Sequence, residues 1–221
     1  LGEFFEASPH MNLLLYPEPV KFDRRQPLDP ARFQYLEGCV RDEVDYELPT
    51  FDANNESPLL YVSFGSLGSG DTTLLKRLMS AVSKLPVRVL FNVGDYESEY
   101  SDIPANVSIA SWYPQPSVIA QVDAVIHHGG NNSFNECIYY GKPALIMPYV
   151  WDGHDNATRV KATGHGLHLH RNEWIEQELA DCIRTLLNDQ PMQARLAATS
   201  AHMRSRRGPA KAAGILNDLL D

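Results

Sequence analysis

The stretch HHGGNNSFNE at residues 127–136 gathers, within one loop and one helical turn, side chains suited to holding an anion. His128 can donate a hydrogen bond to a phosphate oxygen, and Asn132 and Ser133 add further side-chain donors. Gly129 and Gly130 let the backbone pass close to a ligand. The types and spacing therefore favour a phosphate site, although His128 taken alone is equally well read as a loop histidine with local bonds.

Two elements must position these groups. The apolar run at 123–127 predicts a strand, and Phe134, Cys137 and Ile138 are spaced for one face of a helix. The expected order is strand, glycine loop and helix, with Asn132 or Ser133 as the N-cap. The free backbone N–H groups and positive dipole of a helix N-terminus would then face the anion.

Three more side chains could complete a ligand site beside this loop. Glu136 lies one turn into the predicted helix, on the same face as Asn132, and can accept hydrogen bonds from a diol such as a ribose. Trp112 ends the strand predicted at 107–112 and Gln115 follows it, where an indole can stack on a base and an amide can bond to it. The alternatives are a solvated helix acid for Glu136 and a core position for Trp112.

A second glycine loop, GSLGSG at 65–70, follows the apolar run at 59–64. Its order is G-x-x-G-x-G and not the dinucleotide-binding G-x-G-x-x-G, and Asp95 lies beyond the ~20-residue spacing expected of an acid in that motif. A dinucleotide-dependent oxidoreductase is therefore disfavoured. The loop is expected to be a phosphate-facing or merely flexible turn.

From residue 57 onwards, apolar strands alternate with helices. Strands are predicted at 59–64, 87–93, 107–112, 123–127, 143–148 and 166–170, and helices at 71–85, 115–122, 132–140, 155–163, 173–189, 192–205 and 208–220. Asp71 or Thr72 should cap the first helix. This alternation predicts an α/β domain over 57–221, a Rossmann-like doubly wound parallel sheet that binds ligands at the carboxyl ends of its strands.

Residues 1–56 differ in composition, being rich in proline, aromatic and charged residues, with one short strand expected at 11–16 and a polar stretch at 50–58. The favoured interpretation is the end of a preceding domain followed by an interdomain linker. The alternative is an irregular arm wrapped around the α/β domain.

Composition limits the partners. A formal net charge of −9 and a pI near 5.3 argue against nucleic acid and anionic membranes. No apolar run reaches the ~18–20 residues of a transmembrane helix, and neither a signal peptide nor a cysteine framework is evident, so a cytoplasmic location is expected. No carboxylate or cysteine is spaced to complete a metal-binding set with His165, His168 and His170. These histidines are expected to be edge-strand residues, not metal ligands.

The joint spacing of the motifs resembles that of a known family, the nucleotide-sugar-dependent glycosyltransferases that include plant secondary-product and bacterial macrolide and antibiotic enzymes. The resemblance covers about residues 59–220 and rests on YVSFGS at 61–66, W-x-P-Q at 112–115, H-x-G-x-N-S at 128–133, and Glu136, Gly141, Pro143, Pro148 and Asp152. It implies the C-terminal, donor-binding half of a GT-B fold, which faces an N-terminal acceptor domain.

The resemblance also implies roles. Trp112, Gln115 and Glu136 would bind the nucleoside of a UDP- or dTDP-sugar. The diphosphate would be held by Ser66, His128, Gly130, Asn132 and Ser133. Asp152 and Gly153 would face the donor sugar, although Gly153 stands where the family usually has a glutamine that helps to read the sugar.

The implied reaction is inverting transfer to a hydroxyl of a small-molecule, natural-product or lipid-like acceptor, with no metal and no cofactor. The family's general base is a histidine of the N-terminal domain, to which no residue here corresponds, so the 221 residues alone are expected to be inactive. A free-standing nucleotide-sugar-binding subunit with a separate acceptor-domain partner remains the alternative.

Overall fold

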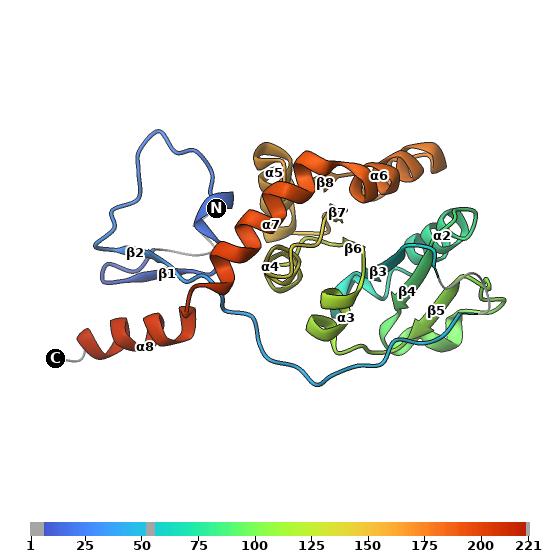
Figure 1. Cartoon of the computed structure of the whole chain (residues 1–221), viewed down its shortest axis with the longest axis horizontal. Helices are drawn as coiled ribbons and strands as arrows, with labels where there is room; N and C mark the ends of the chain where they lie inside the picture. Colours follow the sequence, from blue (N-terminus) through green and yellow to red (C-terminus); the bar gives the residue numbers. More distant parts are fainter. Residues whose placement is uncertain (1–6, 52–55, 220–221) are drawn as a thin grey trace.

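The computed structural model describes residues 7–51 and 56–219, and its centre is a six-stranded parallel sheet (Figure 1). The strand order is β5-β4-β3-β6-β7-β8, which is the order of a doubly wound sheet. The strands are β3 (Leu59–Ser63), β4 (Arg88–Asn92), β5 (Val107–Ala110), β6 (Ala124–His127), β7 (Ala144–Ile146) and β8 (Gly166–His168). The predicted fold class is confirmed, and all six predicted strands of this sheet are present.

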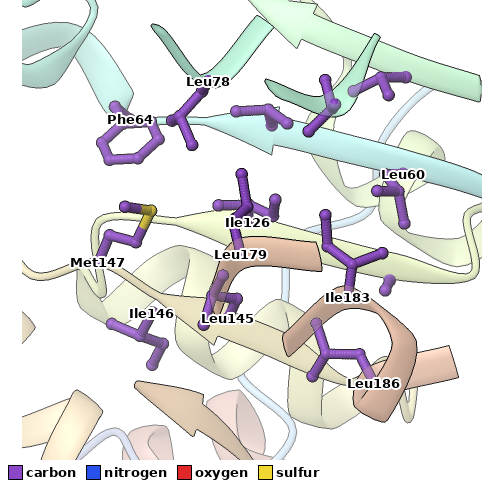
Figure 2. Close-up of a cluster of buried hydrophobic side chains, with 14 of the residues drawn as sticks. Leu60, Phe64, Leu78, Ile126, Leu145, Ile146, Met147, Leu179, Ile183 and Leu186 are labelled. Carbon is purple, nitrogen blue, oxygen red and sulfur yellow. The ribbon is translucent and has the colours of Figure 1, made fainter. Parts of the chain in front are cut away.

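The alternation of side chains along β3 divides the core between the two faces of the sheet. Leu60 belongs to one buried cluster, together with residues of α2 (Thr72–Val82) and α6 (Glu176–Asn188) (Figure 2). Tyr61 points the other way and packs with residues of α3 (Gln115–Gln121) and α4 (Asn131–Tyr139). Because successive strand residues face opposite sides, continuous apolar strands bury both faces.

The structure confirms the predicted cap of one helix and changes the predicted bounds of other elements. Asp71 caps α2, since its carboxylate accepts from the backbone N–H of Leu74. The glycine loop, predicted to be a phosphate-facing or merely flexible turn, forms one helical turn, α1 (Gly65–Gly68). The helix predicted at 155–163 begins three residues earlier, as α5 (Asp152–Thr163), and a short 3-10 helix, η2 (Gly94–Glu99), was not predicted.

Residues 7–37 form the N-terminal segment. It holds two strands, β1 (Asn12–Leu14) and β2 (Phe33–Tyr35), where the sequence predicted only the first, and they pair in parallel. A 3-10 helix, η1 (Glu18–Val20), follows β1. The C-terminal α8 (Gly208–Asp218) lies beside this pair and not over the large sheet, with Nζ of Lys211 donating to the Tyr35 carbonyl at 2.9 Å (Figure 1).

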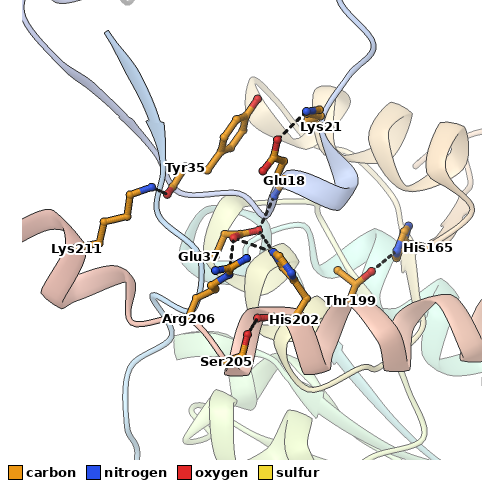
Figure 3. A network of polar contacts seen from close by, with 10 residues as sticks. All are labelled: Glu18, Lys21, Tyr35, Glu37, His165, Thr199, His202, Ser205, Arg206 and Lys211. Atoms are coloured by element: carbon orange, nitrogen blue, oxygen red, sulfur yellow. Dashed lines mark hydrogen bonds and ion pairs between the residues drawn. The ribbon is translucent and has the colours of Figure 1, made fainter. Parts of the chain in front are cut away.

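An ion cluster holds the N-terminal segment against α7 (Gln190–Arg204) (Figure 3). The buried carboxylate of Glu37 accepts from Nε2 of His202 at 2.8 Å and from the backbone N–H of Glu18 at 2.8 Å. Arg206 lies 3.7 Å from the same carboxylate. The segment is thus attached to the α/β domain through polar contacts as well as through Val20, which is buried in the core.

Residues 39–51, which we call the connecting segment, lead from the N-terminal segment towards β3 along α3. The Val44 and Tyr46 carbonyls accept from the side chains of Ser117 and Gln121 at 2.5 and 3.0 Å. The Tyr46 ring meets Tyr113 edge-on at 5.9 Å. This part of the predicted linker is therefore packed on the domain; the rest of the polar stretch, 52–55, lies outside the described residues.

Candidate functional site

The two glycine loops of the sequence meet where the strand order reverses. Chain order runs outwards from β3 to β5 on one side and from β6 to β8 on the other, and Ser63 pairs in register with His127. The loops after β3 and β6 therefore leave the same edge side by side, and a Cβ built on Gly65 would stand 2.9 Å from Cε1 of His128. Ligands of doubly wound sheets bind at this position.

His127, the last residue of β6, and His128, the first residue of the loop after it, have different surroundings. His127 is fully buried, its Nδ1 accepts from the backbone N–H of Gly129 at 3.0 Å, and burial lowers its pKa to about 3. Burial also lowers the pKa of His128, against the opposing influence of the Ser63 backbone and the Asp152 carboxylate. Both rings are therefore neutral near pH 7. Sequence reasoning singled out His128 and missed the part that His127 plays in fixing the loop.

The first turn of α4 is built differently from the prediction. The N-cap is Gly130 and not Asn132 or Ser133, and the helix begins at Asn131. The cap from outside the helix is the carboxylate of Asp152, which accepts from the backbone N–H of Asn131 at 2.9 Å. The next two backbone N–H groups, of Asn132 and Ser133, have no acceptor within a helix that starts here. They are the free donors of the predicted phosphate site.

The turn into α5 lies directly against the β6 loop. A Cβ built on Gly153 would stand 2.6 Å from the His128 carbonyl oxygen, and one on Gly130 would stand 2.5 Å from Nε2 of His128. Neither position can carry a side chain unless the backbone or the ring moves. A glutamine at 153 therefore does not fit this arrangement, which gives a physical reason for the glycine there.

Three of the predicted nucleoside and phosphate residues form one partly buried cluster. The Gln115 amide donates to Glu136 Oε2 at 2.5 Å and to the Ser133 hydroxyl at 3.1 Å. The Glu136 side chain is only 4% exposed, so it is not the solvated helix acid of the alternative reading. Its other oxygen, Oε1, accepts from Nη1 of Arg41 at 3.2 Å.

A cavity of about 360 Å³ opens beside this cluster, at the carboxyl ends of β3, β4 and β5. Trp112 lines it and is 63% exposed, which excludes the core position for this indole. Ser66 lines it from α1. The other residues of its wall are Arg41, Ser63, Gly65, Ser69, Asn92, Gly94, Asp95, Tyr96, Ser111, Tyr113 and Gln115.

A larger cavity, of about 850 Å³, lies elsewhere, between the N-terminal segment and the start of α8. None of the predicted site residues lines it, and it is remote from the sheet edge where the two loops meet. The volume of a cavity alone therefore does not locate this site; the convergence of polar groups does.

The histidines after α5 do not form a metal centre. His165 is buried between the hydroxyls of Thr163 and Thr199, at 2.9 and 2.8 Å, while His168 ends the edge strand β8. The part of the chain that the structure describes holds no group of three His, Cys, Asp or Glu side chains arranged to bind a metal ion. Within residues 7–51 and 56–219, none of the helices is both long and apolar enough to cross a membrane.

Comparison with known proteins identifies the family of the chain. Residues 76–219 match the family described as "Erythromycin biosynthesis protein CIII-like, C-terminal domain", and because the match spans more than half of the chain, the chain belongs to that family. Its relatives are nucleotide-sugar-dependent glycosyltransferases. The class implied by the motifs is thereby confirmed.

Two curated relatives illustrate the similarity. The chain is 28% identical to UDP-glucosyltransferase 2 of Dactylopius coccus, over 72% of this chain and 32% of that protein. It is also 28% identical to the NDP-glycosyltransferase YjiC of Bacillus subtilis (strain 168), over 88% of this chain and 50% of that protein. The chain thus spans about a third to a half of the length of these relatives.

Solved structures show the same fold. The glycotransferase of kitacinnamycin superposes with a TM-score of 0.83 at 24% identity, covering 95% of this chain and 55% of that one. The spinosyn rhamnosyltransferase SpnG, solved with thymidine diphosphate, gives a TM-score of 0.75 at 22% identity, covering 95% and 57%. The parallel sheet with flanking helices is thus one half of a GT-B glycosyltransferase fold.

Proposed function

We propose that this chain is the donor-binding part of an inverting glycosyltransferase that moves a sugar from a UDP- or dTDP-sugar to a hydroxyl of a small natural-product or lipid-like acceptor. The observation that carries the proposal is the meeting, at one sheet edge, of an exposed indole, a buried carboxylate and a helix N-terminus with free N–H groups. These match a base, a ribose diol and a diphosphate.

The proposed donor lies across the edge of the sheet. Its base stacks on Trp112, and its ribose hydroxyls donate to Glu136, which Gln115 holds in place. The diphosphate lies over the first turn of α4, held by Asn132, Ser133 and His128 across Gly130, with Ser66 opposite on α1. Asp152 and Gly153, at the start of α5, are left beside the sugar.

In the proposed reaction, the oxygen of a deprotonated acceptor hydroxyl attacks C1 of the sugar from the face opposite the diphosphate. The new C1–O bond forms as the bond to the diphosphate oxygen breaks, and the electron pair leaves with the diphosphate. The α4 dipole, its free N–H groups and the neutral His128 ring stabilise that growing negative charge. No metal or cofactor is required by this scheme.

The acceptor pocket and the general base belong, in this proposal, to an N-terminal domain that faces the donor site. SpnG and the kitacinnamycin glycotransferase are each about twice as long as the part that this chain matches, which supports that arrangement. The 221 residues by themselves are then expected to bind the donor nucleotide but not to transfer sugar.

Calorimetry of the 221-residue chain tests the ligand class. We expect UDP or dTDP to bind with a Kd of ~10 µM to 1 mM, about −7 to −4 kcal/mol, because only one wall of the cleft is present. Binding should be the same with EDTA. Tight binding of NAD without a signal from UDP or dTDP contradicts the proposal, and rapid sugar transfer by this chain alone contradicts the location of the base.

Substitutions test the phosphate site. His128→Ala and Ser133→Ala should each weaken UDP binding by ~1–3 kcal/mol, because each removes a hydrogen bond to a charged group. His168→Ala, at the end of the edge strand β8, is the matched control and should leave affinity unchanged. Equal losses in all three variants would place the site elsewhere.

A further inference from the structure

Arg41 reaches the Glu136 carboxylate from a segment 95 positions away in the chain. Its Nη1 donates to Oε1 of Glu136 at 3.2 Å, while its Nε donates to Oε2 of Glu43 at 3.1 Å. The Arg41 side chain is half-exposed, and it lines the same cavity as Trp112. The guanidinium therefore bridges a carboxylate of its own segment and the buried carboxylate of α4.

Arg41 is also the only cationic side chain in the wall of that cavity as the described residues define it. A carboxylate as deeply buried as that of Glu136 is costly to keep ionised unless it is paired and hydrogen-bonded. Gln115 and Arg41 provide those two partners, one on each oxygen. Each oxygen keeps a second acceptor position, enough for the two hydroxyls of a ribose.

We propose that Arg41 is a positioning residue for nucleotide binding, which holds the Glu136 carboxylate ionised and fixed for the ribose, so that the connecting segment and the nucleotide site act together. This inference rests on the proposed function. It assigns a role in the donor site to a residue outside every motif of the α/β domain.

The surroundings of Glu136 define the expected pH behaviour. Burial raises its pKa, the hydrogen bond from Gln115 and the charge of Arg41 lower it, and Glu43 raises it again. The other titratable groups that face it are Tyr61 of β3 and Cys137 of α4, whose own pKa values are raised by burial. Tyr140, at the end of α4, also has a raised pKa. These three stay neutral in mildly acidic solution, so Arg41 and Glu43 supply the nearby charge.

Arg41→Met removes the cation and keeps much of the side-chain volume. The pKa of Glu136 should then rise further, and the carboxylate should lose its charge at a higher pH. We expect UDP affinity to fall ~3–10-fold at neutral pH, with a larger loss at about pH 6. Arg41→Lys, which keeps the charge, should give a pH profile nearer to that of the parent protein.

The control is Arg184→Met, which makes the same change of net charge at an exposed ion pair on α6. The second ligand is 2′,3′-dideoxyuridine diphosphate, which keeps the base and phosphates but lacks the hydroxyls that Glu136 would accept. Because Arg41 acts through Glu136, Arg41→Met should weaken UDP binding and leave binding of the dideoxy nucleotide unchanged.

Calorimetric titration of the parent and of Arg41→Met, Arg41→Lys, Arg184→Met and Glu136→Gln with both nucleotides decides the matter. Equal weakening of both nucleotides by Arg41→Met overturns the inference, because Arg41 would then contact the phosphates or base directly. If Arg41→Met binds UDP with the same affinity as the control variant Arg184→Met, the inference is also overturned. If the parent protein binds UDP, and Glu136→Gln weakens binding of UDP but not of the dideoxy nucleotide, either of these two results overturns the inference about Arg41 and leaves the proposed function standing. If the parent protein binds neither UDP nor dTDP, both the inference and the proposed function are overturned.

Discussion

The two ends of the candidate site are built on different principles. At one end, the β6 loop and the start of α5 pack backbone against backbone, so that a Cβ on Gly153 would stand 2.6 Å from the His128 carbonyl oxygen. At the other end, side chains from three segments surround an open cavity, with Gln115 and Arg41 both bonded to Glu136. We call these the loop contact and the open cavity.

The difference separates two kinds of substitution. A change in the loop contact alters the packing of the domain, so its first consequence should be a loss of folding stability. A change at an exposed wall of the open cavity removes a ligand contact while the fold stays intact. Three predictions follow this division, beginning with the two that have the largest effects on free energy.

One of the two largest effects is expected from His127, the fully buried residue at the end of β6 that accepts from the Gly129 N–H of the loop contact. Its pKa is about 3 in the folded protein, against an ordinary value of 6.5, so below pH 6.5 the unfolded chain binds a proton that the folded protein does not. The contribution of neutral His127 to the free energy of unfolding is therefore fully present above about pH 6.5, and it is lost as the pH falls towards 3. The loss is ~1.4 kcal/mol per pH unit, or ~2 kcal/mol at about pH 5.

His127→Asn tests this dependence, because the Asn oxygen can still accept from the Gly129 N–H but does not titrate. Denaturant unfolding at about pH 7 and pH 5 should show a smaller loss of stability on acidification in the variant. Carboxylates elsewhere in the protein contribute equally to both and cancel in the difference. Identical losses in parent and variant would mean that His127 is already protonated, or not buried, in the folded state.

An effect of about the same size is expected from Gly153→Gln, which introduces the residue that the family resemblance implies at this position. The new Cβ must displace the His128 carbonyl or the start of α5, at a cost of about 1–3 kcal/mol in the free energy of unfolding. His154→Gln is the control, because the neighbouring side chain is exposed. A variant of full stability that gains a new sugar preference would show that the loop contact opens easily.

The sequence was sufficient for much of this description. The β6 loop and α4 follow from a buried apolar run, a pair of glycines and a helical spacing of Phe134, Cys137 and Ile138, all of which are local patterns. The site position follows from the general rule for parallel sheets. The sequence therefore predicts that Trp112 and Glu136 lie at the same edge of the sheet.

The remaining features depend on contacts between distant parts of the chain. The cap of α4 was predicted within the helix, but the group that caps it is Asp152, from another element. The family resemblance implies a glutamine at position 153, and only the position of the His128 carbonyl oxygen explains why a glycine is found there. Arg41 lies in a segment with no motif, so its contact with Glu136 could not be read from spacing.

The smallest effect is expected from Trp112, in the wall of the open cavity. Its side chain is 63% exposed, so replacement should leave the free energy of unfolding within about 0.5 kcal/mol of the parent. Stacking on the base should contribute ~0.5–1.5 kcal/mol to nucleotide affinity beyond the buried area. Trp112→Ala should therefore weaken UDP binding by at least that amount at unchanged stability, the reverse of the pattern expected for Gly153→Gln.

Fluorescence provides a second measurement with the milder variant Trp112→Phe. UDP should change the tryptophan emission of the parent, because the base covers an indole that is otherwise exposed, whereas inorganic phosphate should not. Trp151 is exposed and Trp174 is buried, with its Nε1 donating to the Arg171 carbonyl, so both give a background that the variant retains. A UDP-induced change of equal size in parent and Trp112→Phe would show that Trp112 does not contact the base. If replacing Trp112 instead lowered the free energy of unfolding, substitutions in the open cavity and in the loop contact would not differ in the way predicted here.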